Sequence, residues 1–186
     1  MAANINADTS GGLKLQSDTS GEIQLQSAGT TIATVSSTGL TMASGKLLAS
    51  TGPAFIATPS ADQTLSSATW TTIAFNTEVY DTNSNYNTGT YAFTPTVAGY
   101  YNFTTVIRSD AATTRFYTSF TKNATTEYYG DDFNFAASSL NSNFSALIYM
   151  NGSTDSVVAR AFMQGGGGLT TGSGIMRFSA FLARAA

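Results

Sequence analysis

The chain of 186 residues contains no histidine and no cysteine. Serine–histidine–aspartate and cysteine–histidine catalysis are therefore excluded, and so are the usual zinc sites. A serine–lysine nucleophile would have to use Lys14, Lys46 or Lys122, and none of these lysines lies in a recognisable motif. We expect a protein that is not an enzyme and that uses no cofactor.

Charged residues are also scarce. They make up 10% of the chain, against about 25% in a typical soluble domain. The net charge is −3, and the eight basic residues are scattered from Lys14 to Arg184, so no basic run is available to neutralise phosphates. No nucleic-acid partner is therefore expected.

Two further absences concern the membrane and the secretory pathway. No apolar run approaches the ~18 residues of a membrane span, so no membrane partner is expected. Residues 1–12 lack the basic start and apolar core of a signal peptide. The absence of cysteine favours assembly in a reducing cytoplasm.

The sequence is rich in small polar residues and in aromatic rings. Its 12 Phe, 9 Tyr and single Trp argue against a disordered chain. Thr, Ser, Asn, Ala and Gly fill most of the remaining positions, a mixture that suits strands joined by tight turns better than long helices. The composition predicts an all-β protein.

The N-terminal part repeats itself with a period of ten residues. "DTSGGLKLQS" begins at Asp8, "DTSGEIQLQS" begins at Asp18, and the pattern then decays. Each unit has a glycine-containing turn followed by a short alternating strand, which is typical of stacked repeats. The apolar residues of these strands form a stripe: Leu13, Leu15, Ile23, Leu25, Ile32, Leu40 and Met42.

One copy of the chain has too few apolar residues to cover that stripe. We expect several copies to wrap together, for which three chains are well suited, or the segment to lie as an arm on another protein. The alternative is a flexible Ser/Thr/Gly linker, which the regular alternation of Leu and Ile disfavours.

The composition changes at Gly52-Pro53, which divides an extended β-repeat arm, residues 1–52, from a head, residues 53–186. In the head, alternation is clear in segments such as Tyr101–Ile107, and short strands separated by turn signals predict a β-sandwich or jelly roll. The expected strands are residues 54–58, 69–76, 79–81, 90–94, 98–108, 113–122, 125–131, 142–150, 155–163 and 174–184.

The head resembles the globular domain of the C1q/tumour-necrosis-factor superfamily over roughly residues 53–186. The matching positions are Ala54-Phe55, Phe75-Asn76, Tyr80-Asp81, Gly89, Tyr91, Phe93, Gly99, Tyr101, Phe103 and the closing "FSAFL" with Phe178 and Phe181. Ala180 stands where the family usually has glycine. The resemblance implies a ten-stranded jelly roll that forms a tight homotrimer.

The arm has no collagen-like repeat and instead resembles the leading segments of bacteriophage virion proteins. This resemblance implies a virion structural protein, with the head decorating or cementing the capsid and the arm binding the major capsid protein or other virion subunits. The alternative is a receptor-binding tail fibre or fibre tip that contacts a host-surface glycan or protein. A third hypothesis is a secreted, complement-head-type module that binds a soluble ligand.

Three smaller motifs remain. Glu127, Asp131 and Asp132 are candidate Ca²⁺ ligands, although their spacing matches no known calcium loop and an exposed acidic turn at "YGDD" is the simpler interpretation. "GGGG" at 165–168 lacks the Lys-Ser/Thr of a phosphate loop and suits a hairpin tip. Trp70 and several tyrosines could stack on sugars or proteins, or belong to the core or a subunit interface.

Overall fold

The computed structural model describes residues 21–45, 52–110, 112–134, 139–165, 167–169 and 175–186. The chain divides into two compact units, Met1–Ser50 and Thr51–Ala186, which are described separately. Every regular element within the described ranges is a β-strand, and none of these residues forms a helix long and apolar enough to cross a membrane. The prediction of an all-β fold is confirmed.

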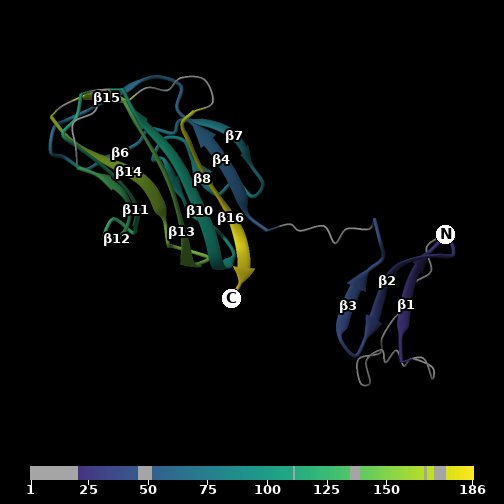
Figure 1. Cartoon of the computed structure of the whole chain (residues 1–186). Coiled ribbons are helices and arrows are strands. Elements are labelled where there is room, and N and C mark those ends of the chain that lie inside the picture. The colour runs from purple at the N-terminus through teal and green to yellow at the C-terminus, as the bar shows by residue number, and fades with distance from the viewer. Residues whose placement is uncertain (1–20, 46–51, 111, 135–138, 166, 170–174) are drawn as a thin grey trace. The chain divides into compact units, whose positions relative to one another are not determined.

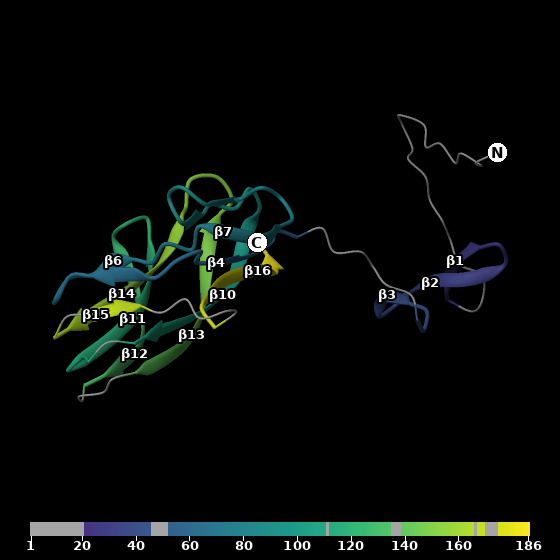
Figure 2. The same ribbon diagram turned by 90° about the horizontal axis from the view of Figure 1, so that it is seen from above.

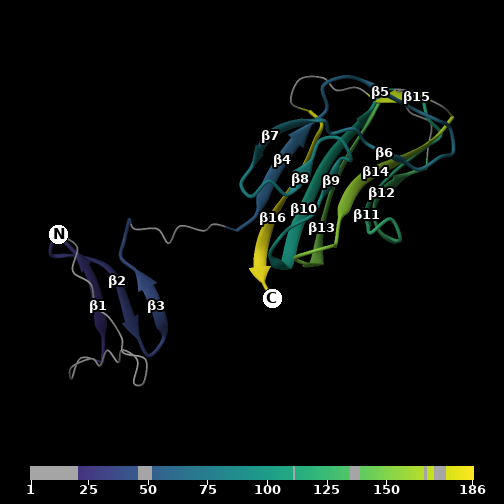
Figure 3. The ribbon, with the colours of Figure 1, turned by 180° about the vertical axis from the view of Figure 1, so that it is seen from behind.

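In the first unit, the described residues form a three-stranded antiparallel sheet in the order β1 (Ile23–Ser27), β2 (Thr30–Ser36) and β3 (Gly39–Met42) (Figure 3). Ala28 and Gly29 make the first turn with φ values of 49° and 75°. Two positive φ values in a two-residue loop suit the right-handed twist of the strands that it joins. The repeat positions Leu13 and Leu15 lie outside the described residues.

The second unit contains a seven-stranded sheet (Figure 1). Its central strand β10 (Ala98–Ser109) pairs antiparallel with β13 (Leu140–Asn151) and with β16 (Arg177–Ala185). The sheet continues from β16 to β4 (Ala54–Thr58) and β7 (Thr77–Asp81). The short strands β15 (Gly167–Leu169) and β5 (Gln63–Leu65) extend its other end.

A six-stranded sheet forms the second layer of the head, which is seen from above in Figure 2. Its three long strands are β12 (Thr126–Phe133), β11 (Arg115–Lys122) and β14 (Val157–Gln164). The short strands β6 (Thr71–Thr72), β9 (Ala92–Phe93) and β8 (Tyr86–Asn87) complete it. The two antiparallel sheets make the predicted jelly-roll sandwich.

Two strand predictions need correction in detail. Residues 69–76 are predicted to form one strand, but the strand is limited to Thr71–Thr72. Ile73 N still donates to Ala159 O of β14, whereas Phe75 N donates to Ile73 O and so turns away from the neighbouring strand. The glycine run at 165–168 was expected to be a hairpin tip, but Gly167 and Gly168 belong to β15 and pair with β5. The sequence offers no side-chain alternation there from which such pairing could be predicted.

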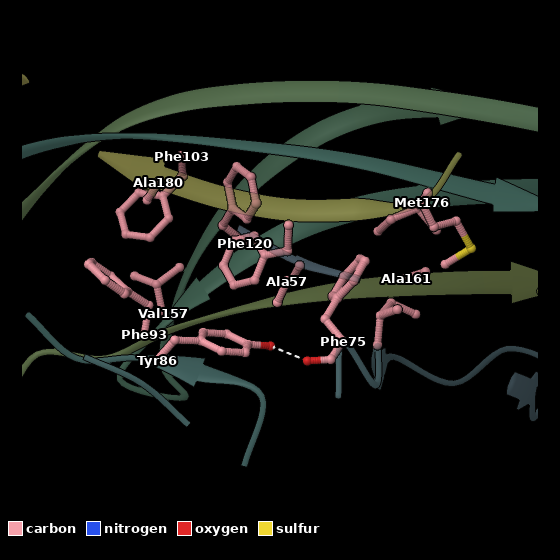
Figure 4. Packing of buried hydrophobic residues seen from close by; sticks show 14 of the residues in the cluster. Ala57, Phe75, Tyr86, Phe93, Phe103, Phe120, Val157, Ala161, Met176 and Ala180 are labelled. Atoms are coloured by element: carbon pink, nitrogen blue, oxygen red, sulfur yellow. Dashed lines mark hydrogen bonds between the residues drawn. The ribbon is translucent and has the colours of Figure 1, made fainter. Parts of the chain in front are cut away.

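The core between the two sheets is built largely of aromatic rings (Figure 4). The ring of Phe178 lies 5.0 Å from that of Phe55 and 5.7 Å from that of Phe120, measured between centroids. The hydroxyl of Tyr86 donates to the backbone oxygen of Phe75 at 2.7 Å, which satisfies the polar end of a buried ring. Burial, with a smaller effect from neighbouring Tyr91 and Glu78, raises the pKa of Tyr86.

Candidate subunit interface

The outer face of the seven-stranded sheet carries a group of exposed apolar side chains. Alternation along β10 turns Tyr101 and Phe103 into the core and Tyr100 outward. Tyr100 pairs directly with Tyr149 of β13, while its neighbour on the same face, Asn102, pairs with both Leu147 and Phe181. We call these residues the apolar face: Tyr100, Leu147, Tyr149 and Phe181, with exposed fractions of 45%, 60%, 43% and 51%.

The apolar face has defined local geometry. The rings of Tyr100 and Tyr149 meet edge to face, with centroids 5.5 Å apart and planes at 61°. Behind them, Lys122 donates through Nζ to the backbone oxygen of Tyr149 at 2.7 Å and forms an ion pair with Asp155 at 2.7 Å. Beside Tyr100 and Leu147, Ala183 and Arg184 complete the lining of a hollow of about 340 Å³. A knob from a partner could enter this hollow.

Asp155 holds the adjoining loop in place. Its carboxylate accepts a hydrogen bond from Asn123 Nδ2 at 2.8 Å and one from the backbone nitrogen of Asn151 at 2.9 Å. Burial acts to raise the pKa of Asp155, but these bonds together with that from Lys122 outweigh it and lower the pKa. The fixed loop, together with Lys122 at the end of β11, holds the end of β13 that carries Tyr149.

The sheet of the first unit has an apolar face of its own. Cross-strand pairing aligns Ile23 with Val35 and Leu40 in one row, and Leu25 with Ala33 and Met42 in the next. We call these six residues the arm face. Within the chain, Leu25, Val35 and Leu40 remain 47%, 40% and 53% exposed. Such an apolar surface on so small a sheet is typical of an interaction site.

The structure gathers the sequence-predicted arm residues only in part. Ile23, Leu25, Leu40 and Met42 lie on the arm face, whereas Ile32 occupies the position where the β1–β2 register shifts, since Leu25 pairs with Ala33 and Gln26 with Thr31. Val35 and Ala33 were missed. Ala33 and Val35 alternate in "TIATVS" and share a face of β2. The bulge at Ile32 breaks the alternation with the preceding residues, which is why the sequence pattern pointed to Ile32 instead.

Most of the aromatic residues of the family motif lie in the head core. Phe55, Phe75, Phe93, Tyr101, Phe103 and Phe178 are all fully buried. Tyr101 donates its hydroxyl hydrogen to the backbone oxygen of Val97 at 2.8 Å. Burial raises the pKa of Tyr101 to about 12.

The other motif residues serve turns, close packing or the surface. Asn76 binds Ser60 through two hydrogen bonds, each of 2.8 Å, and Asn87 Oδ1 accepts from the backbone nitrogen of Gly89. Gly99 is buried where any side chain would meet the backbone of β16 at Arg184. Tyr80, on the edge strand β7, is 45% exposed, and Phe181 belongs to the apolar face.

The three candidate calcium ligands bind different partners. Glu127 accepts from Arg160 Nη1 at 2.9 Å and from Thr121. Asp131 accepts from Ser142 at 3.0 Å. Asp132 accepts two bonds from Arg115, of 2.9 and 2.7 Å, which lower the pKa of that carboxyl.

No group of three or more metal-ligating side chains occurs among the residues that the structure describes. The three carboxylates instead bind separate partners, which lie within the six-stranded sheet for Glu127 and Asp132 and on β13 of the other sheet for Asp131. The glycine between them in the chain, Gly130, packs against Phe144 and leaves no room for a side chain.

Leu147 and Tyr149 belong to the apolar face but are not among the residues predicted from the sequence. The inward positions of β13 alternate with them along the strand: Phe144, Ala146, Ile148 and Met150. The intervening positions, however, are also apolar near the end of the strand. Apolar residues on both faces of one strand indicate that both faces are buried, and this pattern in the sequence could have identified Leu147 and Tyr149.

Comparison with known proteins supports the fold of the head. The pattern of the C1q domain matches residues 54–182, and no match was found among curated protein sequences. Among solved structures, the globular domain of zebrafish complement C1qA is similar, with a TM-score of 0.54 and 20% identity over 73% of this chain and 99% of that chain.

Two other structures share the fold at lower identity. Murine APRIL has a TM-score of 0.54 and 7% identity, covering 70% of this chain and 98% of that one. The PRD1 vertex protein P5 has a TM-score of 0.53 and 12% identity, covering 72% of this chain and 96% of that one. The family match extends over most of the chain and coincides with the jelly-roll head, so the chain belongs to the C1q domain family.

Proposed function

We propose that this protein is a bacteriophage virion structural protein that decorates and stabilises the capsid as a homotrimer. C1q domains are binding or structural modules rather than enzymes, and they form homotrimers. The trimer would be assembled in the host cytoplasm and would bind the shell through residues 1–52. The observation that carries the proposal is the presence of two separate apolar surfaces, the apolar face and the arm face, on one chain of 186 residues.

The two surfaces suit two different contacts. The apolar face combines rings and a leucine around a hollow, as expected where subunits bury large side chains against each other. The arm face is flat and only two rows deep, so it suits strand-like packing on a larger surface. The fold is also that of a protein described as a vertex protein, and this likeness agrees with a structural role in a virion.

The arm contact can be tested on particles assembled with variant protein. Leu25→Asp combined with Leu40→Asp places charge on the arm face and should abolish attachment, while the head stays folded and trimeric. Gln24→Asp combined with Thr41→Asp is the matched control, since these residues pair with Thr34 on the other face of the same strands. Attachment is measured by the amount of protein that sediments with capsids.

Copy number separates decoration from host recognition. Decoration predicts many copies on the capsid surface in images of labelled particles, and lower thermal stability of capsids that lack the protein. A few copies at the tail, with added protein blocking adsorption to the host, would instead establish the fibre function. A protein that is monomeric at micromolar concentration would contradict the trimer.

A further inference from the structure

The outer face of the six-stranded sheet differs in chemistry from the apolar face. Four aromatic side chains from four segments of the chain meet there, and we call them the aromatic platform: Trp70, Tyr117, Tyr129 and Phe162. Trp70 lies centrally, with ring centroids 5.2 Å from Tyr117, 6.0 Å from Tyr129 and 5.6 Å from Phe162. Tyr117 and Tyr129 stack at 5.1 Å, and Tyr129 is 54% exposed.

Two ion pairs frame these rings. Arg115 binds Asp132 through two parallel hydrogen bonds, and its guanidinium lies 5.2 Å from the centroid of Tyr117. Arg160 binds Glu127 and the backbone oxygen of Trp70, and its guanidinium lies 5.8 Å from the centroid of the Trp70 ring. Each cation is matched by one carboxylate, so the platform has planar hydrogen-bonding groups at its border without a net charge.

A third observation concerns Ser119 on the same face. Ser119 pairs with Tyr129 on one side and with Arg160 on the other, which places all three side chains on one face of the sheet. It is nevertheless fully buried, and its hydroxyl has no hydrogen-bond partner. Native proteins leave few buried polar groups unpaired, and such a group is a feature that needs an explanation. The unpaired hydroxyl lies in the same cross-strand row as Tyr129 and Arg160 and is covered from solvent.

We propose that the aromatic platform is a binding site for a neutral saccharide. Ring faces carry partial negative charge, which favours the polarised C–H groups on the apolar face of a pyranose. The guanidinium and carboxylate groups at the border can donate to and accept from paired sugar hydroxyls.

The balanced charge selects against other ligands. A nucleic acid or a polyanionic glycan requires an excess of positive charge, and the chain carries −3 overall. A hydrophobic protein partner fits the apolar face better, because burial there removes no ion pair from water. The inference is independent of the proposed function, since it concerns the opposite sheet and neither the arm nor the apolar face.

Trp70 is the single tryptophan of the chain and therefore reports on the platform alone. Its emission is followed while full-length protein is titrated with dextran, galactan and mannan as neutral probes and with heparin as a polyanionic comparator. We expect a saturable change in emission with at least one neutral probe. The affinity should depend little on salt between about 50 and 500 mM, because an about tenfold change in salt concentration strongly weakens binding that depends on counterion release. Equilibrium dialysis with the same probe should give the same affinity.

Variants then locate the binding. Tyr129→Ala should weaken it at least about tenfold, in line with the loss of one stacked ring. Asp132→Asn, which keeps every ring and alters only the polar border, should also weaken it. Tyr80→Ala is the matched control, because Tyr80 is similarly exposed, at 45%, but lies on the other sheet. Circular dichroism and light scattering confirm that each variant keeps its fold and assembly.

Three results would overturn the proposal. The first is no saturable binding of any neutral probe. The second is an equal loss in Tyr129→Ala and Tyr80→Ala, which would place the binding elsewhere. The third is binding of heparin alone with a steep salt dependence, which would indicate simple charge attraction. None of these results would bear on attachment to capsids, so the two proposals fail separately.

Discussion

Tyr101 and Val97 are joined by a hydrogen bond of 2.8 Å in which the phenol donates to the backbone oxygen at the start of β10. The ring is fully buried, and burial raises its pKa to about 12. An unfolded chain releases this proton near pH 10. The folded state therefore retains the proton at a pH where the unfolded state has lost it.

Tyr101→Phe should accordingly reduce the dependence of stability on alkaline pH. The stabilising contribution of the tyrosine is complete below about pH 10 and is lost as the pH rises from 10 through about 12. At neutral pH the variant should lose about 1 kcal/mol with the hydrogen bond. Urea unfolding at pH 7, 10 and 11.5 measures both effects, and Tyr129→Phe, at an exposed position, serves as the control.

Asp155→Asn should show the opposite dependence at acid pH. The pKa of Asp155 is lowered in the folded state, so its contribution is complete above the ordinary value of about 3.9 and is lost as the pH falls through the lowered value. The variant should be about 2 kcal/mol less stable at pH 7, because Lys122 loses its ionic partner. The difference between variant and parent should shrink below pH 4. A constant difference across that range would contradict the assigned role.

Gly99→Ala should destabilise the head although it adds one methyl group. The methyl carbon would overlap the backbone oxygen of Arg184 and come within 2.7 Å of a methyl carbon of Leu182. We expect a loss of about 1–3 kcal/mol in the free energy of unfolding. Gly89→Ala is the control, since within 4 Å its methyl group would meet only the side-chain oxygen of Asn87, at 3.3 Å, and no backbone atom. Chemical unfolding measures the free energy of unfolding of both variants, and an equal loss in the two would contradict the prediction.

Phe181→Asp should dissociate the trimer. The substitution removes a large ring from the apolar face and adds a charge that must be desolvated, and loss of an aromatic interface contact commonly costs at least about 2 kcal/mol, or about 30-fold in affinity. Sedimentation equilibrium should therefore reveal monomers at concentrations where the parent is trimeric. Tyr129→Asp, with 54% exposure against 51% for Phe181, tests whether any surface charge has this effect. A trimeric Phe181→Asp variant would place the subunit contact elsewhere.

The contents of the core could be predicted well from the sequence because they depend on alternation within single strands. Tyr101, Phe103 and Ile107 were assigned to one face of one strand, and all three are buried. Alternation identifies which residues of a strand share a face, and burial of one face then fixes the choice.

The aromatic platform could not be predicted in the same way. Trp70 and Arg160 are 90 positions apart in the sequence, and their contact depends on the pairing of β6 with β14. Pairing between distant strands leaves no periodic signal in either strand. For the same reason the sequence identified Trp70 as a candidate for stacking but not its partners. The bulge that displaces Ile32 from the arm face was equally invisible, because it depends on the register of β1 against β2.

The position of β4 has a mechanical consequence. This strand is the first of the head, and it lies between β16 on one side and β7 on the other. A pull along β4 from its N-terminal end loads both rows of backbone hydrogen bonds at once, in shear, instead of peeling them apart singly. Tension applied at the N-terminal end of β4 is thus shared across three strands, so the head should resist unfolding by force in this direction better than in a direction that separates the strands one bond at a time.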